Sequence, residues 1–272
     1  MALGSIIKSP IGALASGGVA GSSVYPFVNA EALTLVSAMS VAPTFARKAL
    51  IDALITSLKA DGIWDKLDIL YILAAHDAQA ARLNWKLPGT RTATETATVT
   101  FTTDRGYAGD GVAGDLNTTY NPSTHGVNFL QDSNTLFLWS RTIGQSTIAP
   151  LGNRSAVGSH IHPRNASDQF AYRVSQTAAT TTTANTDGTG LFAASRTGAT
   201  STQGYRNGAT LGAAGSTASV ALSNSPISFG RYGGAFFSTV QGAAIGAGGA
   251  LNGTEHANLY TRLNTYMTAV GA

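Results

Sequence analysis

The chain has 272 residues and a formal net charge of +3, and its charged residues make up only 11%, well below the usual quarter. A hydrophobic content of 43% argues against disorder, and Lys and Arg form no run of the kind that a nucleic-acid-binding stripe requires. The absence of Cys excludes disulfides and thiolate metal sites, and no apolar run reaches the ~20 residues that cross a bilayer.

Residues 1–42 are rich in Gly, Ala and Ser with scattered apolar residues, which predicts an extended N-terminal arm. Its first stretch has a broken apolar run with Pro10 inside it, unlike the basic start and continuous apolar segment of a signal peptide. The arm is either a floppy tail or a segment ordered only against a neighbouring subunit, because apolar residues without a core of their own need a partner surface.

Residues 43–88 predict a helical hairpin. In the first helix, over residues 44–60, apolar residues recur at helical spacing after a Thr44 cap, and Gly62 supplies a left-handed end. A second helix is predicted from Ile63 to Trp85 by a three-four spacing of apolar residues, and Pro88-Gly89 closes it.

The remainder, residues 89–272, predicts an antiparallel sandwich with a C-terminal helix. The Thr-rich residues 92–103 alternate like a strand with one buried face, and Asn207-Gly208 is the strongest short hairpin signal. Other short apolar runs recur at the spacing of a sandwich or barrel: "TLFLWSRT", "DQFAYRVS", "GLFAASRT", "PISFGR" and "FSTVQGAAIG". Near the end, Asn252 and Glu255 form a capping box before an apolar helix face.

Several pieces from about residue 104 onward resemble the concanavalin A-like (laminin G-like) jelly-roll family. In order, they are "GYAGDGVAGDLNTTYNPS", "LFLWSRT", "GLFAASRTGATSTQGYRNGATLG", "ISFGR" and "TVQGAAIGAGGALNGTEHANLY". Together with the preceding "LKADGIWDKLDILYILAAHDAQAARLNW", the chain is similar to proteins of tailed bacteriophages and prophages. The resemblance implies a multi-copy virion protein on the tail, baseplate or capsid surface, in which the arm and helices dock and the sandwich projects.

Catalytic residues are not expected. Glycoside cleavage usually needs two carboxylates at a fixed separation, but the three glutamates, Glu31, Glu95 and Glu255, form no pair on one predicted strand. His76 and Asp77 are adjacent on a predicted helix and so do not face each other, and Asp77 can instead cap a turn.

Two groups of residues raise the question of a metal. His160 and His162 share a face if "GSHIHPR" is a strand, which suits either the start of a metal site without an evident third ligand or a surface or interface pair. Asp104, Asp110 and Asp115 could bind Ca²⁺, as in some laminin G-like domains, but their spacing does not match an EF-hand loop, which favours turn-forming roles for them. We therefore expect no cofactor, with Ca²⁺ as the alternative.

Loop tyrosines and arginines are the candidate carbohydrate-binding residues: Tyr107, Tyr120, Tyr205, Arg206, Arg231 and Tyr232. Aromatic faces of this kind stack on sugars, although loop tyrosines are also common at subunit contacts. The sequence therefore leads to a virion structural protein, assembled in the host cytoplasm, whose partners are copies of itself and other virion proteins, without nucleic acid or membrane insertion. The alternative is a module that binds host surface glycans, and a glycan hydrolase is the third hypothesis.

Overall fold

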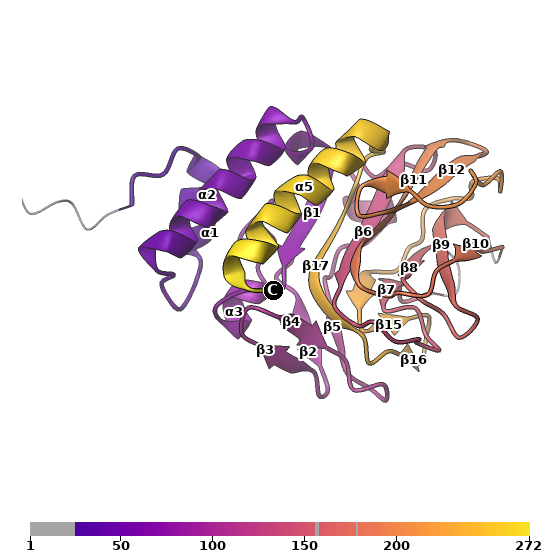
Figure 1. The fold of residues 1–272 in the computed structure, drawn as a ribbon, viewed down its shortest axis with the longest axis horizontal. Helices are drawn as coiled ribbons and strands as arrows, with labels where there is room; N and C mark the ends of the chain where they lie inside the picture. Colours follow the sequence, from indigo (N-terminus) through magenta and orange to yellow (C-terminus); the bar gives the residue numbers. More distant parts are fainter. Residues whose placement is uncertain (1–24, 156–157, 178) are drawn as a thin grey trace, which may run out of the picture.

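The fold is a β-sandwich covered on one side by helices. The structure is a computed structural model and describes residues 25–155, 158–177 and 179–272. Three layers follow one another in Figure 1: the helices α1 (Ala30–Ser37), α2 (Phe45–Ala60) and α5 (Gly253–Val270), then one sheet, then a second sheet. The predicted antiparallel jelly-roll sandwich with a C-terminal helix is confirmed.

The sheet beneath the helices, sheet A, has the order β13-β12-β11-β6-β17-β4-β3, and β1 pairs with β17 off this path. Its strands are β1 (Leu67–Ile72), β3 (Thr100–Thr102), β4 (Gly106–Ala108), β6 (Asn134–Ser140), β11 (Gly190–Gly198), β12 (Ser201–Arg206), β13 (Ala209–Thr210) and β17 (Gln241–Gly248).

The second sheet, sheet B, has the order β10-β9-β8-β7-β14-β5-β2. Its strands are β2 (Thr94–Thr96), β5 (Asp115–Asn117), β7 (Leu151–Asn153), β8 (Gly158–His162), β9 (Gln169–Gln176), β10 (Thr181–Ala184) and β14 (Ile227–Phe229). A separate hairpin, β15 (Arg231–Tyr232) and β16 (Phe236–Phe237), and the short elements η1 (Trp64–Lys66), α3 (Ala78–Ala81) and α4 (Pro122–His125) complete the described chain.

The central strands of sheet A are buried on both faces, and this shapes their sequence. Along β6, Leu136 and Leu138 point into the core between the sheets, whereas Phe137 and Trp139 join the core under the helices. Alternation of side chains along a strand sends successive residues to opposite faces. When both faces are buried, apolar residues can follow one another along the strand, and the regular polar-apolar alternation of a half-exposed strand is lost.

The prediction of a second helix in the hairpin is wrong because this segment contains a strand buried on both faces. The segment Leu67–Ile72 is the buried strand β1, with Ile69 and Tyr71 in the inter-sheet core and Leu70 and Ile72 under the helices. A short continuous apolar run cannot be assigned to helix or strand by periodicity alone. Because β1 pairs with β17 in sheet A, residues 67–72 belong to the sandwich, and the predicted helical hairpin over residues 43–88 does not form.

The extended arm is also corrected where it is described. Residues 30–37 form α1, and just before this helix the amides of Val28 and Asn29 donate to the Asp52 carboxylate of α2 at 2.7 and 3.0 Å. That short apolar helix needs the surface of α2 to form, which a scan along the sequence could not supply. Residues 1–24 of the predicted arm lie outside the described residues.

The predicted strand over residues 92–103 is divided between the two sheets. β2 pairs with β5 in sheet B and β3 pairs with β4 in sheet A, and Ala97 between them has φ of 53°. A left-handed residue turns the chain sharply, so the Thr-rich run crosses from one sheet to the other instead of continuing.

The helix caps and the hairpin turn that the sequence predicts are confirmed. Thr44 caps α2 by accepting from the Arg47 amide, and the capping box of Asn252 and Glu255 begins α5. Asn207 and Gly208 both have positive φ in the turn between β12 and β13, as a two-residue hairpin requires. None of the helices in the described part of the chain is long and apolar enough to cross a membrane.

Candidate functional site

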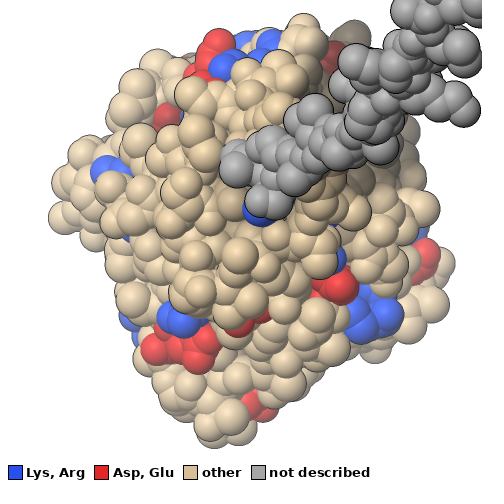
Figure 2. Space-filling model, turned by 90° about the vertical axis from the view of Figure 1, so that its left-hand side faces the viewer, with Lys and Arg blue, Asp and Glu red and all other residues tan. Residues whose placement is uncertain are grey.

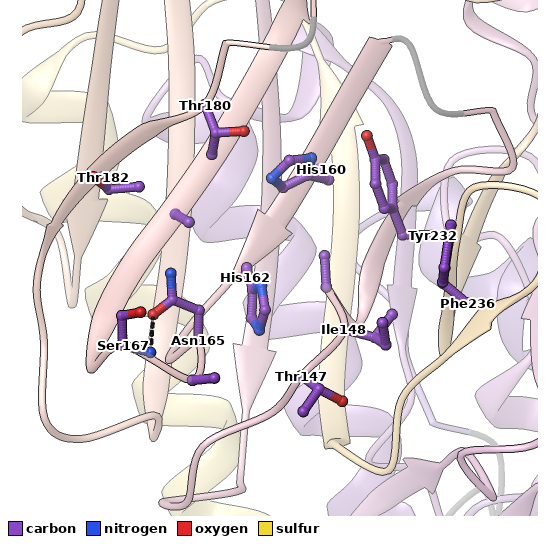
Figure 3. Close-up of a pocket in the computed structure, with 13 residues that line it drawn as sticks. Thr147, Ile148, His160, His162, Asn165, Ser167, Thr180, Thr182, Tyr232 and Phe236 are labelled. Carbon is purple, nitrogen blue, oxygen red and sulfur yellow. Dashed lines mark hydrogen bonds between the residues drawn. The ribbon is translucent and has the colours of Figure 1, made fainter.

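The outer face of sheet B carries a cavity of about 470 Å³, a size typical of small-molecule sites. It lies over β8, β9 and β10, on the side of the sandwich opposite the helices, and Figure 3 shows its lining. Its apolar and aromatic lining residues are Ile148, Ala149, Ala166, Ala171, Tyr232 and Phe236, and its polar ones are Thr147, His160, His162, Asn165, Ser167, Thr180 and Thr182.

Strand β8 places the two histidines. Ile161 packs in the inter-sheet core, so alternation turns the flanking His160 and His162 to the opposite, outer face. The prediction that these two residues share the face of a strand is confirmed. Both are nearly buried, with 5% and 8% of their surface exposed, and therefore lie in the floor of the cavity.

Both imidazoles are neutral at physiological pH. Burial, together with the positive charge of Arg173, holds the pKa of His160 well below its ordinary value of 6.5. Burial lowers the pKa of His162 to about 4, against the opposing effect of a 3.0 Å hydrogen bond between Nε2 and the Ser146 carbonyl. Because a carbonyl only accepts, Nε2 of His162 carries the proton and its Nδ1 is the acceptor.

One wall of the cavity is aromatic. Tyr232 of β15 meets His160 edge-on, with ring centroids 4.7 Å apart, and its hydroxyl accepts from Arg173 at 2.8 Å. Phe236, at the start of β16, lies beside Tyr232 with 53% of its surface exposed (Figure 3). The hairpin therefore presents a ring to solvent at the rim and a second, fixed ring deeper in the cavity.

The opposite side of the cavity supplies hydroxyl and amide groups. Thr180 and Thr182 lie on one side in Figure 3, with Asn165 and Ser167 below them. Asn165 is held in place because its Oδ1 accepts from the amides of Ser167 and Gln169 at 2.9 and 3.0 Å. These residues give the cavity neutral donors and acceptors on fixed backbone.

Gly152 of β7 allows this packing. A Cβ at this position would lie 2.8 Å from Cβ of His160 and 2.9 Å from Cδ2 of Tyr232. A side chain there would push apart the two rings that form the aromatic corner. The close approach is invisible in the sequence, since it depends on the pairing of Gly152 with His160 across β7 and β8.

Of the six candidate carbohydrate-binding residues, only Tyr232 lines this cavity. The other three tyrosines are core residues with at most 7% exposure, and their positions correct the prediction of loop tyrosines: Tyr107, Tyr120 and Tyr205. They are anchored by a hydrogen bond to Glu95, a hydrogen bond to Asp68 and a stack on His256, respectively. Buried rings of this kind cannot stack on a sugar from solvent.

The two candidate arginines serve the protein itself. Arg206 pairs with Asp187 at 2.5 Å and also donates to the Thr189 carbonyl. Arg231 donates to the carbonyls of Gly233 and Gly234 in the β15–β16 turn and lies over the Phe237 ring. These contacts stabilise loops, and Arg231 thereby supports the hairpin that carries Tyr232.

The three aspartates considered for Ca²⁺ have separate partners. Asp104 pairs with Arg47 and the fully buried Asp115 pairs with Arg154, each at 2.5 Å. Asp110 accepts from the amides of residues 112–114, as the turn-forming interpretation expects. Within the described ranges, no group of three or more His, Asp or Glu residues is arranged to hold a metal.

The remaining acidic and histidine candidates have structural partners. Asp77 caps α3 by accepting from the amides of Gln79 and Ala80, and His76 meets the Val41 carbonyl through Nε2. Glu31 pairs with Lys59, Glu95 accepts from Tyr107, and Glu255 completes the capping box.

No protein-family model and no curated protein matches the chain. Solved structures with the same fold include Trypanosoma rangeli sialidase in complex with 2,3-difluoro-KDN, with TM-score 0.53 and 13% identity over 82% of this chain and 40% of that one. They also include the binding domain of botulinum neurotoxin DC in complex with rat synaptotagmin II, with TM-score 0.54 and 13% identity over 74% of this chain and 52% of that one.

A third similar structure belongs to a report that cell entry of botulinum neurotoxin type C depends on two ganglioside molecules, with TM-score 0.53 and 13% identity over 75% of this chain and 53% of that one. The chain spans about half or less of the length of these proteins. The likeness shows a shared β-sandwich fold.

Proposed function

We propose that the protein is a carbohydrate-binding module that holds a glycan, without cleaving it, in the cavity on the outer face of sheet B. The observation that carries the proposal is the cavity of about 470 Å³ with aromatic rings on one wall and neutral polar groups on the other. A pyranose has an apolar face of C–H groups and an edge of hydroxyls. The two walls match those two sides.

The fold comparisons support a binding role in a coarse way. The report on the botulinum neurotoxin type C structure names gangliosides, and the sialidase structure contains a sugar-derived ligand. These facts belong to those proteins. The proposal for this chain rests on its own cavity.

Binding without turnover is part of the proposal. The described residues that line the cavity include no Asp or Glu, whereas most glycosidases use a carboxylate pair. A tyrosine nucleophile, which some sialidases use, would need an activated hydroxyl. Burial raises the pKa of Tyr232, and its hydroxyl is engaged by Arg173, so this tyrosine suits a wall better than a nucleophile.

The test compares two exposed phenylalanines at different sites in the full-length chain. Phe236→Ala removes the exposed ring of the cavity and should weaken binding to the oligosaccharides that the wild type retains on a glycan array by tenfold or more. Phe45→Ala removes a ring of similar exposure, 56%, on α2 and should bind normally. Equal binding by both variants, or no glycan binding by the wild type, would contradict the proposal.

A second candidate function is the virion structural role, with assembly through the N-terminal elements. Its supporting observation is a set of apolar side chains on and beside α1 and α2 that are at least half exposed: Val28, Leu33, Val41, Phe45 and Leu87. Charged groups are sparse over much of that side of the molecule in Figure 2. Apolar patches of this kind mark interaction sites.

In this second proposal the partners are copies of the chain and other virion proteins. Changing Leu33 and Phe45 together to Ser should abolish concentration-dependent self-association in sedimentation velocity and incorporation into particles. Glycan binding should be unaffected, because the cavity lies on the other side of the sandwich. Unchanged self-association and incorporation would remove the support for assembly through this face.

A further inference from the structure

A second hollow, which we call the α5-end hollow, lies on the helix-facing side of sheet A. It has a volume of about 260 Å³ and lies where α5 ends, beyond the cap at Gly271. The end of the chain that borders it is marked C in Figure 1. It shares no lining residue with the cavity on sheet B, and its own lining residues are Trp139, Ser140, Arg141, Thr189, Gly190 and Ala272.

Strand β6 places an indole and a guanidinium side by side in this hollow. Phe137 and Trp139 belong to the core under the helices. Side chains alternate along a strand, so Arg141, two residues after Trp139, continues on the same face. Its backbone is fixed because its amide donates to the Gln241 carbonyl of β17 at 2.8 Å. The cover of helices ends here, and Arg141 is the residue of that face next to the opening.

Both side chains have hydrogen-bond donors that no described residue uses. Only 8% of the Trp139 surface is exposed, yet within the described chain its indole Nε1 is neither hydrogen-bonded nor fully enclosed. The same is true of the two terminal nitrogens of Arg141, whereas its Nε is fully buried without a partner. The accessible donors therefore belong to two side chains that line one hollow.

The charge of Arg141 is not offset by a carboxylate. No Asp or Glu is among the described residues that line the hollow. Asp187, which holds Thr189 at its edge, is paired with Arg206 at 2.5 Å, and no ion pair joins Ala272 to Arg141 in the described chain. Burial lowers the pKa of Arg141, and the positive charge of Arg105 lowers it further.

The strand pairing explains why Arg105 lies near Arg141. The residue after Arg105, Gly106, is pressed against β17, where an added Cβ would overlap the Gly242 carbonyl oxygen. Gly242 is paired with Ser140, the residue before Arg141. Arg105 is exposed and its side chain has no partner among the described residues. Two guanidinium charges at one end of a sheet, without a carboxylate between them, attract an anion.

We propose that the α5-end hollow binds an oxyanion, namely the carboxylate, sulfate or phosphate group of a small ligand, through Arg141 and the indole N–H of Trp139. A guanidinium pairs with two oxygens of such a group at once. An indole N–H is a donor only, so it also requires an acceptor. Arg105 adds attraction without contact. The site is separate from the proposed glycan cavity and takes a different class of ligand.

The oxyanion has two sources with the same chemistry at Arg141: a free inorganic anion, or an acidic group carried on a sugar. Sodium sulfate is titrated into the ¹⁵N-labelled full-length protein at constant ionic strength, with sodium chloride as the balancing salt. The indole N–H of Trp139 and the amides of residues 139–141 and 189–190 should shift and saturate. Glucose 6-sulfate that binds more tightly than sulfate identifies a sugar-linked anion, and equal affinity identifies a free one. Glucose should not shift these signals.

Substitutions separate the two contacts from the long-range charge. Arg141→Gln should weaken sulfate binding about tenfold, and Arg141→Lys should recover part of the loss. Trp139→Phe keeps an aromatic ring and removes the N–H, and it should weaken binding about threefold. Arg105→Gln should have a smaller effect of about twofold, which higher ionic strength suppresses. Circular dichroism and the melting temperature identify any variant that fails to fold.

Arg91→Gln is the matched control. Arg91 also has no side-chain partner among the described residues, but it lines another hollow together with Asp65 and Asp68. Its removal changes the net charge by the same amount as Arg141→Gln, and it should leave sulfate binding at the α5-end hollow unchanged. Equal losses in the two variants would show that sulfate responds to net charge alone and would overturn the site.

Two further results would overturn the proposal. One is a set of wild-type shifts that rise linearly with sulfate without saturating, or that lie away from residues 139–141 and 189–190. The other is unchanged sulfate affinity in a folded Arg141→Gln variant. The wild-type titration is independent of any failure of a variant to fold, and none of these results depends on glycan binding at the cavity on sheet B.

Discussion

The two sheets of the sandwich have different surroundings. The central strands of sheet A are packed between the helices and sheet B, so both of their faces are buried, whereas sheet B has one face in the core and one face that carries the cavity. Buried strands can vary only within tight packing limits. A sheet with one free face can present polar and aromatic side chains there without loss of the core, and the proposed site is accordingly on sheet B.

The largest expected effect comes from sheet A. Phe137 is fully buried under the helices, and its ring contacts Gly246, where an added Cβ would lie 2.2 Å from its Cζ. Phe137→Ala should lower the free energy of unfolding by about 3–5 kcal/mol, because it removes a packed ring and leaves a cavity. Urea denaturation measures the change, and Phe236→Ala on sheet B, changing stability by less than about 0.5 kcal/mol, is the control. Similar losses of stability in the two variants would contradict the difference in burial between Phe137 and Phe236.

Acid should weaken both sides of the sandwich. The pKa of His162 on sheet B is about 4, and the pKa of His256, on the buried face of α5 against Ser195 and Tyr205, is about 3. Both are below the unfolded value of 6.5, so the unfolded chain takes up protons first as the pH falls. The contribution of each neutral histidine to the free energy of unfolding is complete above about pH 6.5. It is lost as the pH falls, down to about pH 4 for His162 and about pH 3 for His256.

Protonation of each of these two histidines should lower the free energy of unfolding by roughly 2 kcal/mol between pH 8 and pH 5. Urea denaturation at several pH values measures how the free energy of unfolding depends on pH. His256→Gln should reduce the slope of that dependence by the equivalent of about one proton taken up on unfolding. If His256→Gln and the wild type have the same slope, then His256 is not buried in its neutral form as the structure has it.

A smaller effect should separate stability from binding. Gly152→Ala places a methyl group against His160 and Tyr232, and overpacking of this kind costs about 1–3 kcal/mol. The variant should remain folded at 25 °C while glycan affinity falls at least tenfold, because the aromatic corner is displaced. Gly144→Ala, at a glycine with open space around it, is the matched control. Normal glycan binding by a folded Gly152→Ala variant would contradict the position of the site.

The smallest expected effect concerns α5, one of the helices packed on sheet A. Asn252 accepts from the Glu255 amide at 3.0 Å and caps α5. Asn252→Ala should lower the free energy of unfolding by about 1 kcal/mol, visible as a small drop in melting temperature, with unchanged glycan binding. A change in binding would mean that α5 and the cavity are coupled through the sandwich.

The sequence predicted elements whose signals are local and missed those that depend on packing. The Thr44 cap, the Asn207-Gly208 turn and the Asn252–Glu255 capping box each act within a few residues, and all three are as predicted. The strand β1 was mistaken for helix because burial on both faces removes the alternation that identifies a strand.

The site was harder to predict for a related reason. His160 and His162 were recognised as sharing a face, but nothing in the sequence indicates that the β15–β16 hairpin brings Tyr232 and Phe236 beside them. Aromatic residues near Gly and Asn look alike whether they are exposed or buried. Tyr107, Tyr120 and Tyr205 therefore appeared to be loop residues, although tertiary contacts place them in the core.

The most direct test of carbohydrate binding at this cavity is to map a bound oligosaccharide on the ¹⁵N-labelled full-length protein by NMR titration. We expect amide shift changes to concentrate on β8, residues 165–167 and the β15–β16 hairpin, and α1, α2 and α5 to be unaffected. Shift changes concentrated on the helices, or on the edges of sheet A away from this cavity, would contradict the assignment of carbohydrate binding to the outer face of sheet B.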